Sequence, residues 1–439
     1  IYTMEKIITD LAIVAAGPAG LCASVAAAEA GVQVAVFEKS SIAGGTANMG
    51  MGPFGVESRI QKRTMGTLRK EEAFRRFMDY VHWQSDANLV HDYIWNSGPT
   101  IDWLEDMGVR FAGAMKNFPA SEATWHVVMP DDGSRPGARS ASAMNDGKKV
   151  TGLIAKSDDG TEYEVSAKAV IIATGGFGTN PEMVKQYCNY TLEHDMFDFL
   201  VPGIMGDGIR MAWEIGAGHG RMEMERTGGS PLPGAKLGKY PQSGMFRNAG
   251  AIAVNKLGYR CCDESVLQNT SVAGNIIDYQ KDRTMYRILS SSAIKHYRRN
   301  GPDFPNEVFH DDPAENFEEE WEKIAAEHPT IAYAANSPEE LAEKIGMPVD
   351  TFVETIERYN DQCDQNYDDD FCKSREYLVP LTGKKFYALR FAPGAYGSLG
   401  GIKINHKLQV ITDDYEVIEG LYGAGSDVCD LYNGTYYYY

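Results

Sequence analysis

The sequence lacks the cysteine patterns that bind metals or haem. Its seven cysteines form no CxxC pair and no CxxCH motif, and no group of histidines, cysteines and carboxylates has metal-ligand spacing. They also show no disulfide-like framework, which suits a reducing compartment and predicts a cytoplasmic location. We therefore expect neither a metal site nor a covalently attached haem.

Basic residues are also few. The 42 lysines and arginines are outnumbered by 61 aspartates and glutamates, which gives a formal net charge of −19 at pH 7. A chain with this charge is repelled by phosphate-rich surfaces. We therefore expect no nucleic acid and no anionic membrane as a partner.

No uninterrupted apolar run predicts a membrane helix. The window Leu11 to Ala28 has 18 residues without charge, which is long enough for a membrane span or the core of a signal peptide. Gly17 and Pro18 interrupt it, and Pro18 would break a continuous helix. We therefore predict a chain without membrane insertion, whose 439 residues fold into two domains or lobes.

The stretch Asp10 to Ser40 predicts a strand, a glycine turn, a helix and a second strand. Leu11 to Ala15 is a short apolar run, as in strands buried on both faces of a parallel sheet. Leu21 to Ala30 is rich in alanine, a good helix former, and Gly31 follows as a C-cap. Val32 to Phe37 is the second strand. This order predicts a βαβ unit.

The turn of this unit is typical of dinucleotide binding. Gly17 and Gly20 allow the backbone to approach a pyrophosphate, which the N–H groups at the start of the helix then hold. Glu38 follows 21 residues after Gly17, where an acidic residue accepts hydrogen bonds from a ribose. Ala15 stands where GxGxxG has its first glycine. The alternative, which this departure favours, is a buried βαβ unit without a ligand.

Several later segments have a regular pattern. Ser40 to Gly55 is a glycine-rich loop, either a mobile surface loop or a backbone that lies against a flat ligand. Glu71 to Val109 is helical by its apolar spacing. His126, in a polar loop, is either structural or part of a substrate pocket. Two strands are predicted at Lys149 to Ala155 and Thr161 to Val170, joined by a turn at 158–160.

Further helices are predicted later in the chain. The segment Asn316 to Glu327 is acidic and most simply a solvated helix. Pro338 to Ile345 and Pro348 to Cys363 follow as two helices, each with an acidic first turn.

A family resemblance rests on several motifs that occur in order. The strand that begins at Val170 ends in Ala173-Thr174-Gly175-Gly176-Phe177, and Gly423-Ala424-Gly425 lies near the end of the chain. Together with the N-terminal unit, this chain resembles the flavoprotein family of fumarate reductases, urocanate reductases and 3-ketosteroid dehydrogenases. Further matches are Gly206-Asp207-Gly208, the stretch from Gly250 to Asn255 that leads to Arg260 and Glu264, and Leu399-Gly400-Gly401.

The resemblance covers essentially the whole chain and implies an α/β fold with FAD as the cofactor. A Rossmann-like FAD-binding domain, a parallel sheet with helices, would comprise 1–225 and 386–439. An inserted α+β capping domain would comprise 226–385. The implied FAD-binding residues are Gly17, Gly20, Glu38, Lys39, Gly44, Gly45, Thr46, Gly50, Gly52, Thr174, Gly175, Asp207, Gly425 and Asp427.

Four polar anchors that fumarate reductases use for a dicarboxylate are missing here. Alignment through the motifs places the proton-donor arginine on Ile294 and a second arginine on Tyr436. The two histidines fall on Gly397 and near Thr227. A buried dianion without paired charge is strongly unfavourable, so this pocket is not expected to hold fumarate. A shift of one or two residues in the alignment would restore Lys295 or Arg226.

Tyrosines stand near these positions instead. A tyrosine can bind a neutral carbonyl through its O–H and pack against an apolar skeleton. This resembles the ketosteroid dehydrogenases, and the alternative for each tyrosine is ordinary packing. The predicted catalytic residues are Tyr396, Tyr387 and Tyr436, with the N–H of Gly397 or Ser398, and Tyr432 is a further pocket candidate.

The predicted reaction is hydride transfer between flavin N5 and a C=C bond conjugated to a carbonyl, with a tyrosine exchanging the α-proton. The substrate would be an enone or steroid-like molecule, and electrons would come from an external donor. His126, Arg247 and Glu264 are further candidates for the substrate pocket. One alternative is a carboxylate ene-reductase of the fumarate or urocanate type, with Arg247, Arg226 and Lys295 as cations. Another is a flavin module for electron transfer or redox sensing.

Two departures from the family concern segments of chain. The family has a helix and a strand between the positions of Met144 and Asn145, and a further glycine turn and helix after the position of Tyr439. We expect that both segments belong to the natural chain. The direction of the reaction, the electron donor and the oligomeric state are not encoded in these motifs.

Overall fold

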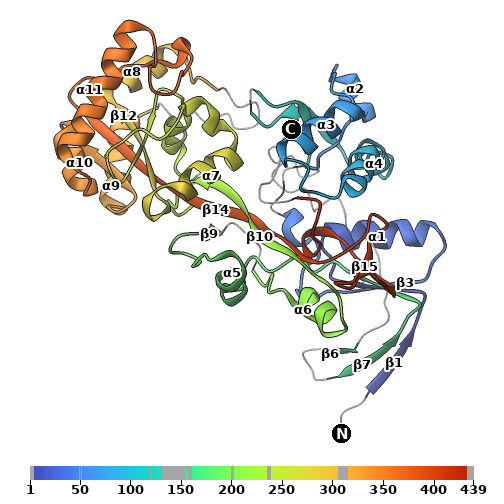
Figure 1. Ribbon diagram of the computed structural model, residues 1–439. Helices are drawn as coiled ribbons and strands as arrows, with labels where there is room; N and C mark the ends of the chain where they lie inside the picture. The colour runs from blue at the N-terminus through green and yellow to red at the C-terminus, as the bar shows by residue number, and fades with distance from the viewer. Residues whose placement is uncertain are drawn as a thin grey trace. The chain divides into compact units, whose positions relative to one another are not determined.

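The computed structural model describes residues 4–48, 50, 52–118, 120–130, 154–156, 161–198, 202–234, 239–304 and 315–432. The chain forms two compact units, each built from helices and sheet (Figure 1). The first unit comprises Ile1–Leu192, Asp198–Glu225 and Ala395–Tyr439, and the second comprises Glu193–Phe197 and Arg226–Gly394. That these units are an FAD-binding and a capping domain stays a prediction.

A five-stranded sheet is the centre of the first unit. Its strand order is β15-β16-β8-β2-β3, in which β16, β8, β2 and β3 are parallel and β15 pairs antiparallel with β16. Ala12, Ile13 and Ala35 are fully buried in it, as expected for parallel strands covered on both faces. The strands are β2 (Leu11–Val14), β3 (Val34–Phe37), β8 (Ala169–Ile172), β15 (Gln409–Ile411) and β16 (Val417–Gly423).

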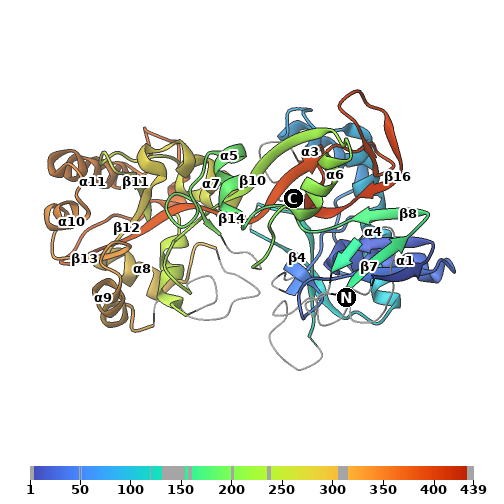
Figure 2. The ribbon, with the colours of Figure 1, turned by 90° about the horizontal axis from the view of Figure 1, so that it is seen from below.

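Helix α1 (Pro18–Glu29) packs on β2 and β3 of this sheet. Figure 1 shows it beside β3, and Figure 2 shows the same unit from below. Gly31 follows the helix with a φ of +77°, the left-handed conformation of a C-cap glycine. The predicted βαβ unit is therefore confirmed. The parallel strands with their covering helix also confirm the predicted α/β fold class.

Two smaller sheets and several helices complete the first unit. One sheet has the order β1-β7-β6, and β4 pairs with β5 in the other. Their strands are β1 (Met4–Ile8), β4 (Phe111–Lys116), β5 (Ala123–Val128), β6 (Ile154–Lys156) and β7 (Glu162–Ser166). The helices are α2 (Arg59–Arg63), α3 (Lys70–Tyr80), α4 (Ala87–Asp106), α5 (Pro181–Cys188) and α6 (Asp207–Glu214).

The second unit is built on an antiparallel sheet. The long strand β14 (Phe386–Ile402) pairs with β12 over Phe386–Phe391 and with β13 over Phe386–Leu389, and its other partners are β9 and β10. β11 continues the sheet beside β12. The partner strands are β9 (Phe197–Asp198), β10 (His219–Gly229), β11 (Ile252–Asn255), β12 (Met285–Ser290) and β13 (Ala332–Ala335). The residues of β10 up to Glu225 and of β14 from Ala395 belong to the first unit.

Helices cover this sheet and bury a large aromatic core. Helices α9 and α10 pack on β13, and α8 packs on β12. The core includes Phe246, Phe317, Trp321 and Tyr387, all fully buried. The helices of this unit are α7 (Thr270–Tyr279), α8 (Ser291–Asn300), α9 (Phe317–Glu327), α10 (Pro338–Ile345) and α11 (Val349–Gln365).

Two predicted elements are wrong in extent. The segment predicted to be helical from Glu71 to Val109 forms two helices, α3 and α4. They are separated because His82 and Trp83 have left-handed backbones and Asp86 caps α4. The strand predicted at Thr161 to Val170 is broken between β7 and β8. The turn predicted at 158–160, and the Met144–Asn145 junction, lie outside the described residues.

No helix in the described ranges combines the length and the apolar character that a bilayer crossing requires. Nor do the described side chains include a group of three or more histidines, cysteines and carboxylates able to hold a metal ion.

Candidate functional site

The turn between β2 and α1 has a backbone suited to an anion. Gly17 is the N-cap of α1, and no side chain caps the helix or places a negative charge in its first turn. The N–H groups of this turn can therefore bind a phosphate. A Cβ at Gly20 would clash with the carbonyl oxygen of Ala15, so only glycine fits there.

Ala15 adopts the conformation for which the motif normally has glycine. Its φ is +84°, in the region that L-residues rarely occupy. Its N–H donates to the carbonyl of Phe37 in β3, which helps to fix this backbone. Alanine in place of the first glycine of the motif therefore leaves the conformation of the turn unchanged.

Glu38 lies directly after β3 and faces the same turn. Its Oε2 accepts from the N–H of Ala16 at 2.8 Å, and its Oε1 accepts from the N–H of Ser40 at 2.8 Å. A carboxylate oxygen can accept more than one hydrogen bond, so each retains capacity for a ribose hydroxyl. The position is the one that dinucleotide-binding folds use for ribose recognition.

Lys39 and Asp207 form an ion pair near this edge of the sheet. The Lys39 Nζ lies 2.6 Å from Asp207 Oδ2, and Arg210 donates to Asp207 Oδ1 at 2.7 Å. Burial acts to raise the pKa of Asp207, but the two cations outweigh it and lower that pKa. Arg210 was not predicted from the sequence, although an acid and a base three residues apart on a helix are a recognisable pair.

The loop after β3 returns to the turn. Gly44 donates its N–H to the carbonyl of Ala16 at 2.8 Å, and a Cβ at Gly45 would lie 3.2 Å from the Cα of Gly17. Thr46 belongs to the 3₁₀ helix Gly45–Asn48, and its carbonyl accepts from the N–H of Gly50. Gly52 packs so closely on the carbonyl of His126 in β5 that a Cβ there would clash.

Asp427 joins the end of the chain to the Thr174-Gly175-Gly176 turn. Its buried carboxylate accepts from Thr174 Oγ1 at 2.9 Å and from the N–H of Gly176 at 2.9 Å, and also from the N–H groups of Thr174 and Gly175. Burial raises the pKa of Asp427, and these hydrogen bonds oppose the rise. Gly425, with a φ of +74°, packs on Ala19 in the first turn of α1.

These segments of the first unit together fit an FAD. They provide an uncapped helix start, close-packed glycines and an oriented carboxylate, which are the groups that bind a pyrophosphate and a ribose. We call this arrangement the cradle, defined by Ala15–Gly20, Glu38, Gly44–Thr46, Thr174–Gly176 and Gly425–Asp427.

Tyr396, Gly397 and Ser398 lie in the part of β14 that belongs to the first unit. Tyr396 is 40% exposed, whereas Ser398 is fully buried and its Oγ accepts from the N–H of Phe177 at 2.8 Å. The hydroxyl of Ser398 therefore holds the strand to the Thr174–Phe177 turn. A catalytic role for Tyr396 and for the N–H of Gly397 or Ser398 stays a prediction.

Tyr387 lies in the core of the second unit. Its ring packs edge-on against Phe317 at 5.2 Å, and its Oη has no hydrogen-bond partner among the described residues. Burial raises the pKa of Tyr387 to about 12. These contacts are those of a packing residue, so its predicted catalytic role has no support from its surroundings. Tyr436 lies outside the described residues.

Two of the three residues predicted for a substrate pocket have structural partners. His126 is fully buried, and its Nε2 and Nδ1 lie 2.6 Å from Ser58 Oγ and 3.0 Å from the carbonyl of Thr124. Burial lowers the pKa of His126, so this ring is neutral. Glu264 is also fully buried and pairs with Arg260 and Lys373.

The third, Arg247, is exposed at the end of a 3₁₀ helix in the second unit.

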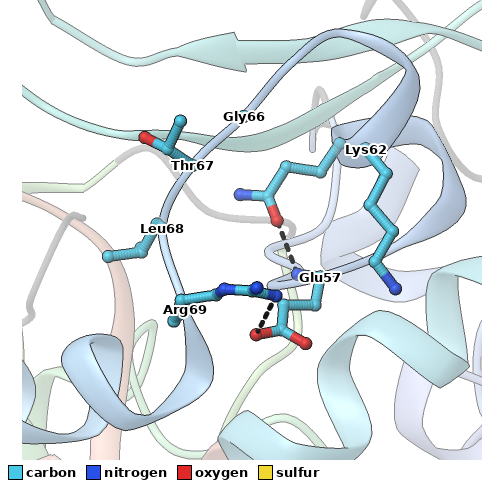
Figure 3. A pocket seen from close by; sticks show the side chains of 7 residues that line it. Glu57, Lys62, Gly66, Thr67, Leu68 and Arg69 are labelled. Atoms are coloured by element: carbon cyan, nitrogen blue, oxygen red, sulfur yellow. Dashed lines mark hydrogen bonds and ion pairs between the residues drawn. The ribbon is translucent and has the colours of Figure 1, made fainter.

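A cavity in the first unit has a volume of about 330 Å³ and is drawn in Figure 3. Its lining comes from one stretch of chain, and Glu57 and Arg69 already pair across it at 3.4 Å. Five of the seven lining residues have polar or charged side chains, whereas a conjugated, mainly apolar molecule is expected in a pocket lined mainly by apolar residues. Its lining residues are Glu57, Gln61, Lys62, Gly66, Thr67, Leu68 and Arg69.

Comparison with known proteins agrees with the chemistry of the cradle. The family described as FAD binding domain matches residues 10–146 and 138–437. A vinyl phenol reductase of Lactiplantibacillus plantarum is 31% identical over 97% of this chain and 91% of its own length. An NADH:fumarate oxidoreductase of Klebsiella pneumoniae is 27% identical over 97% of this chain, which spans 45% of that protein.

The fold also matches a solved structure. It is that of 3-ketosteroid-Δ4-(5α)-dehydrogenase from Rhodococcus jostii, with a TM-score of 0.70 and 22% identity over 96% of this chain and 92% of the other.

Proposed function

This chain belongs to the FAD binding domain family and is an FAD-dependent oxidoreductase that acts on CH–CH groups; from that premise we propose that it reduces the C=C bond of a neutral, conjugated substrate. The double bond would be conjugated to an oxygen-bearing group, such as the carbonyl of an enone or the ring of a phenol. The predicted enone and the vinyl phenol named by the relative both belong to this class.

The proposal rests on one observation, the burial of Ile294 among apolar residues. By the motif alignment it stands where fumarate reductases have their proton-donor arginine, and here it is fully buried in the core of the second unit. No proton can come from this side chain. A substrate reduced by this protein must receive its proton from another group.

One of the three alternative cations is paired with a carboxylate. Arg226 lies 3.0 Å from Asp278, and a cation that already has a carboxylate partner is a weaker partner for a second anion. Thr227, near the position of a family histidine, is buried and uncharged. These features favour a neutral substrate over a dicarboxylate.

The chemistry divides between cofactor and protein. FAD supplies hydride at N5 when it is bound and reduced. Tyr396 would then deliver the proton, and the N–H of Gly397 or Ser398 would donate to the substrate oxygen on which negative charge develops. One hydride and one proton together saturate one C=C bond.

The test is anaerobic reoxidation of the reduced holoprotein, followed by flavin absorbance. We expect rapid reoxidation by 4-vinylphenol or by a 4-ene-3-ketosteroid and none by fumarate. Reoxidation by fumarate alone would contradict the proposal and favour the carboxylate ene-reductase. No reoxidation by any of the three would also contradict it and favour an electron-transfer module.

The identity to an NADH:fumarate oxidoreductase favours the carboxylate alternative. In either case we propose that an external donor supplies the electrons.

A further inference from the structure

The cavity drawn in Figure 3 belongs entirely to the first unit. Its volume of about 330 Å³ lies at the lower end of the range found for small-molecule sites. Its walls come from helix α2 and the chain on either side of it, from Glu57 to Arg69. There is room for a small molecule, and the charges of the walls indicate its chemistry.

Lys62 is a cation of this cavity without a carboxylate partner. Helix α2 carries three cations, and two of them pair with α4: Arg59 lies 2.6 Å from Asp106, and Arg63 pairs with Glu105. Lys62 lines the cavity and has no ion-pair partner among the described residues. Carboxylates are in excess in a chain with a formal net charge of −19, so this unpaired lysine marks the cavity as a place for an anion.

Arg69 is the second cation of the cavity, and its pairing with Glu57 is loose. Its Nη1 lies 3.4 Å from Glu57 Oε1, and the N–H of Lys70 lies 3.3 Å from the same oxygen. Both distances exceed the usual N–H···O separation of about 2.7–3.2 Å. The side chain of Arg69 is 70% exposed, and an exposed ion pair contributes little to stability. Arg69 can therefore turn from Glu57 to a ligand at little cost.

The carboxylate of the cavity stands on a fixed backbone. Gln61, 1% exposed, accepts from the N–H of Glu57 at 2.5 Å and donates to a carbonyl of β5 at 3.0 Å. Arg69 directly follows Leu68, which is 3% exposed in an apolar core. In Figure 3 the side chains of Lys62 and Arg69 lie on either side of Glu57. The fold thus places two cations and one carboxylate around the same space.

We propose that this cavity binds a small monocarboxylate, with Lys62 and Arg69 on its carboxylate group and the hydroxyl of Thr67 as a further donor. Two cations and one carboxylate leave one positive charge, which a single negative charge neutralises. A guanidinium binds a carboxylate through two parallel hydrogen bonds, and an ammonium binds it as a point charge. Glu57 repels the second charge of a dianion. The inference goes beyond the proposed function and does not rest on it, because no residue of the cavity belongs to the cradle.

The test is fluorine NMR of trifluoroacetate, an inert monocarboxylate, added to the FAD-loaded protein. We expect its line to broaden with the wild type, while the line of neutral trifluoroethanol stays narrow. Lys62→Gln and Arg69→Gln should each weaken trifluoroacetate binding by about fivefold, the effect of losing an exposed ion pair. No broadening with the wild type, or equal broadening of both compounds, would overturn the proposal.

Arg63→Gln is the matched control. It removes the same charge from the same helix, but Arg63 pairs with Glu105 and does not line the cavity. Trifluoroacetate binding to this variant should match that of the wild type. A loss equal to that of Lys62→Gln would mean that the anion responds only to the overall charge of α2, and the site would be refuted. Flavin absorbance per protein should be unchanged in all of these variants, which verifies that each is folded.

Glu57→Gln tests the choice of a monoanion. Removing this carboxylate frees Arg69 and ends the repulsion of a second charge, so trifluoroacetate should bind about fivefold more tightly. At pH 8 inorganic phosphate, largely a dianion, should displace trifluoroacetate poorly from the wild type and well from Glu57→Gln. Unchanged binding in Glu57→Gln, or displacement from the wild type by phosphate as effective as that by acetate, would overturn the assignment to monocarboxylates.

Discussion

The Oδ1 of Asp427 accepts a hydrogen bond from the N–H of Gly176 at 2.9 Å, across 251 residues of sequence. The same carboxylate binds the N–H groups of Thr174 and Gly175 and the hydroxyl of Thr174. One fully buried side chain therefore organises the turn that lies at the end of β8.

Replacing Asp427 should cost both stability and cofactor. Asp427→Ala leaves several buried donors without acceptors, at about 1–3 kcal/mol for each. We expect a lower melting temperature and less flavin absorbance per protein. Asp414→Asn, an exposed carboxylate on the same unit, is the matched control. Full FAD content in Asp427→Ala would show that this carboxylate does not support the cradle.

Two substitutions in the β2–α1 turn should have opposite effects on stability. Ala15→Gly should raise the free energy of unfolding by roughly 1 kcal/mol, because it removes the strain of an alanine at φ +84°. Gly20→Ala should lower stability and FAD content, because its Cβ clashes with the carbonyl of Ala15. Urea unfolding and FAD titration measure both effects. A lower free energy of unfolding for Ala15→Gly than for the wild type would mean that contacts of the Ala15 methyl stabilise the fold by more than the strained φ destabilises it.

Acid should weaken the second unit through Asp368, which is 1% exposed. Burial acts to raise its pKa, but Arg260 outweighs burial and holds the pKa at about 2, below the ordinary 3.8. A lowered carboxylate pKa stabilises the fold above pH 4, and this contribution is lost as the pH falls towards 2. The Asp368 carboxylate contributes roughly 2 kcal/mol to the free energy of unfolding at neutral pH, and about half of this contribution is lost by pH 3.

Urea unfolding of wild type and Asp368→Asn at pH 6 and pH 3 measures this contribution. The difference in unfolding free energy between the two proteins should shrink at pH 3. A difference that stays constant would contradict the assigned pKa.

Tyr387→Phe should stabilise the protein. The Oη of Tyr387 is buried without a partner among the described residues, and removing such a group recovers about 1 kcal/mol. Tyr297→Phe is the contrast, because the Tyr297 hydroxyl donates to Asp303 and accepts from Gly250. Thermal unfolding should move in opposite directions for the two variants. Loss of turnover in a well-folded Tyr387→Phe would instead restore its predicted catalytic role.

Tyr396→Phe should slow reoxidation of the reduced flavin by an enone by roughly 100-fold or more, without loss of FAD, because it removes the proposed proton donor. Tyr415, 73% exposed, provides the control variant Tyr415→Phe. Stopped-flow absorbance under anaerobic conditions gives the rate. A rate equal to that of the control would remove Tyr396 from the mechanism.

The sequence predicted best where structure depends on local pattern. The β2–α1–β3 unit follows from apolar runs and glycines that are close in sequence. The interruption between α3 and α4 depends on the left-handed backbones of His82 and Trp83, for which these residue types give no signal. The acidic segment before Glu327 also has a buried face, formed by Phe317, Trp321 and Ile324.

Candidate site residues were harder to predict, because their partners lie far away in sequence. Glu264 pairs with Lys373, 109 residues later, and His126 with Ser58, 68 residues earlier. The presence of a charged or titratable residue in a motif does not reveal whether a distant residue already forms an ion pair or hydrogen bond with it. The glycines of the cradle were easier to predict, and at Gly20 the nearby carbonyl of Ala15 excludes any other residue.

The left-handed alanine before α1 changes how such motifs should be searched for. A search written in residue letters, with glycine required at three positions, passes over this chain. A search written in backbone angles would accept it, since Ala15 occupies the same region of φ as a glycine. Proteins that replaced this glycine, and support the strained turn through neighbouring strands, would then be found together with those that kept it.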